Sequence, residues 1–403
     1  MTTLLGRAKG SPLDVTFRNA PTGTIDLLSP NAPQIRTLEL ETRFFLDVVR
    51  FSELGSGQFP LLHTLKINSP LETHNRAGRP HVVNLPTPPL FGGSVHLERF
   101  VFTSGRIQCL SKFVFPNLTS FELSSDPKEF VNVLFLLDFL KTSPMLQTVK
   151  MVINANVTLP MGCRGEKTAV VLPNVETFFL CVEDVNASNS YALTDVYDIA
   201  TRISCPRAKR TSLHQKIIDQ NITPRDLGGR ILPSSWDEIA PLYPVNPVEE
   251  VTLKIRIRYA NSGNTTCSLI FLSSNATAFV FFYEAHETVG YGWPDDIELE
   301  DISWGAFSQA CRLIQNHPLV SHLRRLHIEF MSPLGIPQQV LEAANDVREL
   351  FSSLGPLDEL TIRGCDLNMF VACFLNHLVF DWTMLTDPSF SPQIIFPQVE
   401  ELL

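Results

Sequence analysis

Apolar residues recur along this chain in a short phrase of the form apolar-x-x-apolar-x-apolar, usually with a proline a few residues upstream. The end of each phrase alternates with a period of two, which predicts a short β-strand with one buried face. In the first half of the chain the apolar positions are Ile35, Leu38, Leu40; Leu62, Leu65, Ile67; Leu97, Phe100, Phe102; Leu118, Phe121, Leu123; Leu146, Val149, Met151; and Val175, Phe178, Leu180. In the second half they are Val248, Val251, Leu253; Leu323, Leu326, Ile328; Leu357, Leu360, Ile362; and Val399, Leu402.

The spacing of the phrases predicts a repeat architecture. From Ile35 to Val175 five intervals cover 140 residues, a mean of 28, which lies within the range of roughly 20–29 residues for leucine-rich repeats. The next two intervals, of 73 and 75 residues, are about twice as long, and Thr211-Ser212-Leu213 after Pro206 is a candidate hidden copy. The copy at Leu357 also continues to Cys365 and Leu367, and Asn154 occupies the equivalent turn position after an earlier phrase.

Helical patterns separate some of the strands. We expect helices over 130–141, 304–315 and 340–354, where apolar residues recur at i, i+3 and i+4. The helix at 340–354 contradicts a parallel β-helix, and the period-two phrases contradict an all-helical solenoid. The fold class predicted is therefore α/β: an irregular leucine-rich-repeat-like solenoid with a concave parallel sheet, and with helices and loops on the convex side.

The segment 256–300 departs from the repeat. Two apolar, β-rich runs, 267–272 and 277–283, flank Ser273-Ser274-Asn275, which predicts a hairpin. We interpret 256–300 as a β-rich insertion or a widening of the sheet inside a single domain spanning 1–403; a domain boundary there is the less favoured alternative.

Composition narrows the class of protein. With 403 residues, 44% hydrophobic and 18% charged, the chain has too much apolar content for a disordered protein. Its net charge of −10, with one dense basic run at Arg207, Lys209 and Arg210, argues against nucleic-acid binding. The most apolar stretch, 130–140, is too short to cross a membrane. With no secretory signal visible, we expect an intracellular protein, cytoplasmic or nuclear, with reduced and mostly buried cysteines.

No pattern specifies catalysis, a cofactor or a metal. The phosphate-binding loop, the nucleophile elbow, the His-Glu-x-x-His helix and paired Cys-x-x-Cys motifs are all missing from the sequence. The acidic segment from Asp295 to Asp301 lacks the glycine and spaced glutamate of a calcium loop. The histidines at 317, 322 and 327 are evenly spaced, but we expect structural or exposed side chains there rather than ligands. We expect no catalytic, cofactor-binding or metal-binding residues.

The concave face of the predicted sheet is the candidate site, because such a face forms an extended recognition surface. The residue between the last two apolar positions of each phrase points to this face. Its candidate protein-binding residues are Glu39, Lys66, Glu122, Lys150, Phe179, Thr252, His327 and Thr361, with Val101 in the same row.

Several phrases together resemble the fungal F-box/leucine-rich-repeat-like proteins. They include Phe59-Pro-Leu-Leu-His-Thr-Leu65, Phe115-Pro-Asn-Leu-Thr-Ser-Phe121, Leu137-Asp-Phe-Leu-Lys-Thr-Ser-Pro144, Leu172-Pro-Asn-Val-Glu-Thr-Phe178, Pro247-Val-Glu-Glu-Val-Thr-Leu253 and Gly355-Pro-Leu-Asp-Glu-Leu-Thr-Ile362. The resemblance implies the substrate receptor of an SCF-type ubiquitin ligase, in which an N-terminal F-box docks the Skp adaptor and the repeats hold a protein target. Only ten residues precede Ser11, so we expect the F-box to be missing and the Skp adaptor to be a partner only where an F-box lies upstream.

The function expected is therefore a non-catalytic protein-binding repeat scaffold, the substrate-recognition part of such a receptor. A free-standing interaction scaffold without a ligase role is the first alternative. An enzyme with a loop-borne site, after Cys181 or around Asp295, is the remote one.

Overall fold

The computed structural model describes residues 11–18, 29–42, 48, 59–69, 91, 96–103, 107–125, 131–153, 157–158, 170–184, 196–217, 232–233, 236, 242, 248–258, 264–273, 278–286, 299–330, 340–355, 357–363 and 393–395. The chain folds as two compact units. Unit 1 comprises Met1–Val182 and Arg202–Arg207, and unit 2 comprises Glu183–Thr201 and Ala208–Leu403.

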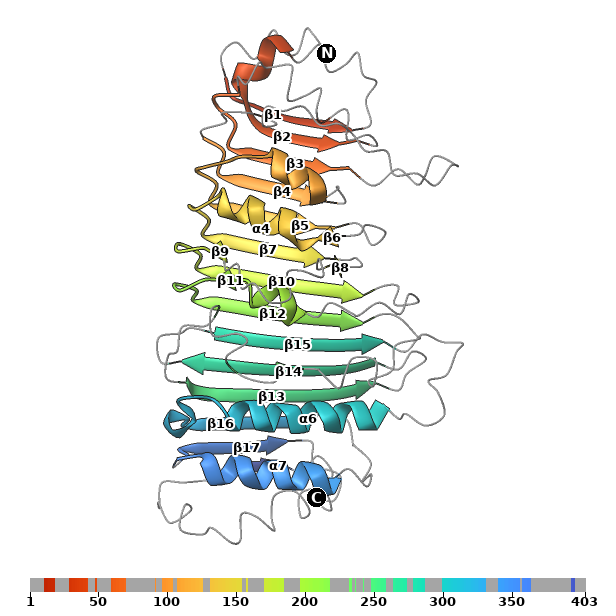
Figure 1. Cartoon of the computed structure of the whole chain (residues 1–403), viewed down its shortest axis with the longest axis vertical. Helices are drawn as coiled ribbons and strands as arrows, with labels where there is room; N and C mark the ends of the chain where they lie inside the picture. The colour runs from red at the N-terminus through yellow and green to blue at the C-terminus, as the bar shows by residue number, and fades with distance from the viewer. Residues whose placement is uncertain are drawn as a thin grey trace, which may run out of the picture. The chain divides into compact units, whose positions relative to one another are not determined.

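Unit 1 is built on parallel strands in chain order, β1-β2-β3-β4-β5-β7-β10, drawn from red to yellow-green in Figure 1. They are β1 (Leu13–Arg18), β2 (Ile35–Glu41), β3 (Thr64–Asn68), β4 (Arg99–Thr103), β5 (Ser120–Ser124), β7 (Thr148–Ile153) and β10 (Thr177–Asp184). Two short pairs lie beside this sheet: β6 (Val131–Asn132) with β8 (Val157–Thr158), and β9 (Val170–Val171) with β11 (Ile203–Ser204). The helices for which the structure gives bounds in this unit are η1 (Ser29–Gln34), η2 (Ile107–Lys112) and α4 (Val133–Lys141).

The parallel register places equivalent phrase positions opposite one another. Leu38, Leu65, Phe100, Phe121, Val149 and Phe178 form one continuous row of fully buried residues. Phe139 of α4 packs onto this row, with its ring centroid 4.7 Å from that of Phe121 and 5.9 Å from that of Phe100. Burying each such side chain contributes about 1.5–3 kcal/mol, so α4 and the strand interiors together form the core of unit 1.

A β-turn with proline at its second position precedes most of these strands. The backbone N–H of Leu62 donates to the carbonyl of Phe59 at 3.1 Å, and the same bond joins Leu118 to Phe115 at 3.2 Å and Val175 to Leu172 at 3.4 Å. Proline fits this position because its fixed φ matches the turn and its missing N–H is not needed there. The recurring proline of the sequence phrase is therefore a turn residue.

A second backbone feature repeats at the start of the strands. Two successive backbone N–H groups at the start of one strand donate to the same carbonyl, which belongs to the residue just before the preceding strand. The His63 carbonyl accepts from Glu98 and Arg99, that of Glu98 from Thr119 and Ser120, that of Thr119 from Gln147 and Thr148, and that of Gln147 from Glu176 and Thr177. This arrangement ties each repeat to the one before it through the main chain alone.

Unit 2 has a mixed sheet, in the order β12-β15-β14-β13-β16-β17-β18. Its strands are β12 (Arg210–Ile217), β13 (Val248–Arg258), β14 (Asn264–Ser273), β15 (Ala278–His286), β16 (Arg325–Phe330), β17 (Glu359–Arg363) and β18 (Gln393–Ile395). β14 runs antiparallel to both β13 and β15, and the other neighbours are parallel. The helices are α5 (Val196–Ala200), α6 (Leu299–Gln315), η5 (Val320–His322) and α7 (Val340–Ser353).

The repeat logic continues in part of unit 2. Val251, Leu326 and Leu360 lie opposite one another and are buried. The carbonyl of Arg324 accepts from both Asp358 and Glu359, as in unit 1. Gly355 lies just before β17, where the backbone passes close to Ser321. A Cβ at position 355 would lie 2.7 Å from the backbone oxygen of Ser321, so this position requires glycine.

The α/β class and a large, mostly parallel sheet with few helices are confirmed. The sheet departs from the expected parallel arrangement at the hairpin predicted within 256–300, where β14 runs antiparallel to β13 and β15. Helices occur close to the predicted ranges, although 131–132 form β6 and α6 begins earlier, at Leu299. The hidden copy at Thr211-Ser212-Leu213 lies on β12. The last phrase at Val399, Asn154 and Cys365 lie outside the described residues, and the assignment of 1–403 as one domain stays a prediction.

Candidate protein-binding face

The central row of unit 1's outward sheet face contains five of the predicted site residues. Register places Glu39 opposite Lys66, Lys66 opposite Val101, Val101 opposite Glu122, Glu122 opposite Lys150, and Lys150 opposite Phe179. Parallel neighbours are about 4.8 Å apart, so residues from six sequence-distant strands form one continuous row. Their side chains face away from the buried row because strand residues alternate between faces.

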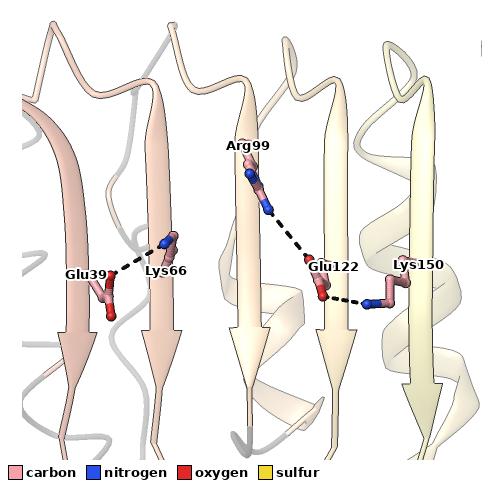
Figure 2. A network of polar contacts seen from close by, with 5 residues as sticks. All are labelled: Glu39, Lys66, Arg99, Glu122 and Lys150. Atoms are coloured by element: carbon pink, nitrogen blue, oxygen red, sulfur yellow. Dashed lines mark hydrogen bonds and ion pairs between the residues drawn. The ribbon is translucent and has the colours of Figure 1, made fainter.

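Ion pairs connect most of this row (Figure 2). Lys66 Nζ lies 3.4 Å from Glu39 Oε2, and Lys150 Nζ lies 2.9 Å from Glu122 Oε1. Arg99 Nη2 lies 3.7 Å from Glu122 Oε2, so Glu122 serves two cations. We call Glu39, Lys66, Arg99, Val101, Glu122 and Lys150 the ladder face. The charged side chains are 34–54% exposed, and such pairs contribute about 0–1 kcal/mol each.

Arg99 was not among the predicted site residues. It precedes Val101 by two residues, and the period of two places both on the same face. The sequence therefore contained the signal, but the prediction took one position per strand and omitted the neighbouring rows.

The first strands of unit 1 carry two more pairs. Arg36 binds Asp14 through two hydrogen bonds, Nη2 to Oδ2 at 2.8 Å and Nε to Oδ1 at 3.3 Å, and Arg18 lies 3.4 Å from Glu41. The hydrogen bonds from Arg36 lower the pKa of Asp14. Each of these cations therefore has a carboxylate partner on the adjacent strand.

The remaining predicted residues lie on unit 2. Thr252, His327 and Thr361 occupy consecutive register positions. The His327 ring nitrogens lie 3.9 Å from Glu250 and 3.9 Å from Glu359. Thr361 is only 4% exposed, and its hydroxyl donates to Glu359, so it offers little contact surface.

Unit 2 differs from unit 1 on the outward positions of the hairpin strands. Ile270 lies opposite Thr252 and Val280 lies opposite Ile270, and both are half-buried. We call Ile270, Leu272, Ala278, Val280 and Phe282 the hairpin face. His214 packs on Phe282 with ring centroids 5.1 Å apart, and its burial lowers the pKa of the imidazole to about 4. These apolar residues were missed because they belong to no repeat phrase.

The other sequence candidates remain separate. His317 is buried against Trp236, with ring centroids 4.5 Å apart, and accepts the Leu319 N–H at its Nδ1. His322 is exposed and His327 lies on the sheet. Within the described ranges no group of three or more His, Cys, Asp or Glu side chains is arranged to hold a metal ion. Asp295, Asp296 and Glu298 lie outside those ranges.

The described free cysteines are buried thiols. They are Cys181, Cys205, Cys267 and Cys311. Burial raises the pKa of Cys205 and of Cys267 to about 12. A thiol must ionise to act as a nucleophile or ligand, so Cys205 and Cys267 are packing residues in this structure.

Comparison with known proteins adds no family to this picture. No family model matches the chain, and a search of curated proteins finds no significant match. Among the helices of the described residues, none has the length and apolar character needed to cross a membrane. The functional argument therefore depends on the geometry of the outward sheet positions in each unit.

Proposed function

We propose that this chain is a non-catalytic protein-binding scaffold, built as an irregular leucine-rich-repeat-like solenoid, that holds a protein target on its outward sheet face. One observation carries the proposal: the ladder face presents registered, half-exposed side chains of mixed chemistry from consecutive strands. A rigid sheet fixes the positions of these side chains before binding, which reduces the entropy lost on association.

The repeat character of unit 1 supports the solenoid part of the proposal. The proline turn and the shared carbonyl recur from strand to strand, and each strand pairs with the next along the chain. Repeats of this kind use neighbouring copies to bury their apolar faces, and they leave an extended surface for a partner.

The biological role we propose is recognition of a substrate for an SCF-type ubiquitin ligase. Its support is the resemblance of the proline-led phrases to fungal F-box/leucine-rich-repeat-like proteins. In that role the ladder face binds the target, and the ligase adaptor binds elsewhere.

The test is capture of a target from a cell lysate, with identification by mass spectrometry and confirmation with the purified partner. The double variant Lys66→Glu with Lys150→Glu reverses two charges of the ladder face and should lower target affinity at least about tenfold. The matched control, Lys141→Glu with Arg348→Glu, makes the same change in net charge at exposed positions of α4 and α7.

Equal loss of capture in both double variants would contradict binding at the ladder face. Recovery of the Skp adaptor and cullin together with the target would support the ligase role. A confirmed target recovered without these subunits would favour a free-standing scaffold.

A further inference from the structure

The ion pairs of the ladder face leave a gap between β3 and β4. Lys66 of β3 pairs with Glu39 of β2, on the side away from β4. Arg99 of β4 pairs with Glu122 of β5, on the side away from β3. None of the described ion pairs joins β3 to β4, although ion pairs cross β1–β2, β2–β3, β4–β5 and β5–β7. Figure 2 shows Lys66 directed towards Glu39 and Arg99 directed towards Glu122, each away from the other's strand.

The residues opposite the two cations are uncharged. Val101 lies directly opposite Lys66 and is half-buried, while Thr64 lies opposite Arg99. Two cations therefore occupy diagonal positions on adjacent strands, with a valine beside them and no described carboxylate between them. We call Lys66, Val101 and Arg99 the cationic seam.

Cations exceed carboxylates by one on the ladder face. Lys66, Arg99 and Lys150 share only Glu39 and Glu122, whereas the chain as a whole has a net charge of −10. A carboxylate placed between Lys66 and Arg99 would accept charge-assisted hydrogen bonds from both.

We infer that the cationic seam binds a carboxylate side chain from an extended acidic segment of the protein partner. This inference rests on the proposed function and names the chemistry of its partner. The carboxylate lies between Lys66 Nζ and the Arg99 guanidinium, and its methylene group contacts Val101. Lys150 binds a second acidic side chain of the same segment.

The spacing of the cations sets the pattern of that segment. Three strand intervals separate Lys66 from Lys150, a distance of about 14 Å. In an extended peptide, residues four apart lie about 14 Å apart and point to the same side. An acidic-x-x-x-acidic segment crossing the strands therefore reaches both lysines.

The binding test uses a fluorescein-labelled deca-glutamate peptide, with deca-glutamine as the neutral control and fluorescence anisotropy as the measurement. Deca-glutamate should bind the full chain, with an affinity that falls as salt is raised; deca-glutamine should not bind. Lys66→Glu and Arg99→Glu should each weaken binding about tenfold. Lys141→Glu, an exposed reversal on α4, should leave it unchanged.

A second variant tests the seam from inside the fold. Val101→Glu places a carboxylate beside Lys66, so it should weaken deca-glutamate binding, whereas the neutral Val101→Gln should bind more tightly. Glu122 lies directly opposite position 101 on the next strand, so the new carboxylate should bring no gain in stability. Deca-glutamate binding as tight in Val101→Glu as in Val101→Gln would overturn the inference.

The outcomes separate this inference from the proposed function. Target capture that depends on Lys66 and Lys150, without deca-glutamate binding, would overturn the acidic segment and leave the scaffold in place. Tighter binding of single-stranded DNA than of deca-glutamate, lost equally in Lys66→Glu, would replace the acidic peptide with a nucleic acid. Deca-glutamate binding that is unchanged in Lys66→Glu and Arg99→Glu would overturn the inference, and the capture experiment would still decide the proposed function.

Discussion

The outward positions of the sheet are polar in unit 1 and apolar in the hairpin of unit 2. The ladder face consists mainly of charged residues joined by ion pairs, whereas the hairpin face presents Ile270, Leu272, Ala278, Val280 and Phe282 at equivalent positions. Both sets lie opposite a buried row that is uniformly apolar. The inward positions must therefore be apolar in both units, while the outward positions are charged in unit 1 and apolar in the hairpin.

The difference follows from how each strand is made. Strands of unit 1 alternate buried and exposed residues, which is typical of a sheet with one solvated face. Strands β14 and β15 carry apolar side chains on both faces over 269–272 and 278–282, so this stretch lacks the polar alternation of unit 1. The hairpin face is therefore apolar and half-buried, and the ladder face is charged and half-exposed.

The largest effect is expected for a substitution in the buried row, which both units share. Phe100→Ala should lower the free energy of unfolding by about 3–5 kcal/mol. Its ring contacts Phe113, Phe115, Phe121 and Phe139, so the cavity cannot be filled by one neighbour. Chemical denaturation measures the change. Val101→Ala on the opposite face is the control, and an equal loss there would contradict the assignment of the two faces.

The second prediction concerns a buried histidine of unit 2. Burial lowers the pKa of His317 to about 4, so the folded state binds fewer protons than the unfolded state between pH 4 and about 6.5. Stability is therefore fully present above pH 6.5 and is lost as the pH falls towards 4, by about 2–3 kcal/mol from this group.

Denaturation at pH 7 and pH 5 measures this loss. His317→Gln should reduce the pH dependence, and His322→Gln, at an exposed position, should not change it. An unchanged pH dependence in His317→Gln would mean that other groups dominate the acid response; His214, also buried with a lowered pKa, is the next one to replace.

The third prediction compares equivalent outward positions directly. Ile270→Thr on the hairpin face should cost about 1 kcal/mol, since it removes apolar contact from a half-buried site. Lys150→Thr on the ladder face should change stability by less than about 0.5 kcal/mol, because its side chain is 51% exposed. Thermal unfolding of both variants in the same buffer measures the two losses of stability. Equal losses would contradict the difference in burial between the two faces.

Much of the fold was predictable because the constraint on the buried face is uniform. Leu38, Leu65, Phe121, Val149, Phe178, Val251, Leu326 and Leu360 were expected to be buried, and all are. The same alternation placed Glu39, Lys66, Glu122 and Lys150 in one row.

Other features were not encoded in that alternation. Ile270 and Val280 lie in the apolar runs 269–272 and 278–282, so a period of two cannot assign their direction. The antiparallel insertion of β14 depends on pairing between 248–258 and 264–273 rather than on any one strand. The partner of Lys66 follows from register between neighbouring strands, and Thr361 fits the pattern for exposure but is buried by its surroundings.

The smallest effect is expected for a single ion pair of the ladder face. A double-mutant cycle of Lys150→Ala and Glu122→Ala should give a coupling energy of about 0.2–1 kcal/mol, because both partners are partly exposed. Arg99 lies 3.7 Å from the same carboxylate, so in an Arg99→Ala background Glu122 is left with Lys150 alone and the coupling should rise. Raising the salt concentration should reduce both values. A coupling that ignores salt would mean that this pair acts through packing, and the ladder face would then lose the electrostatic character that distinguishes it from the hairpin face.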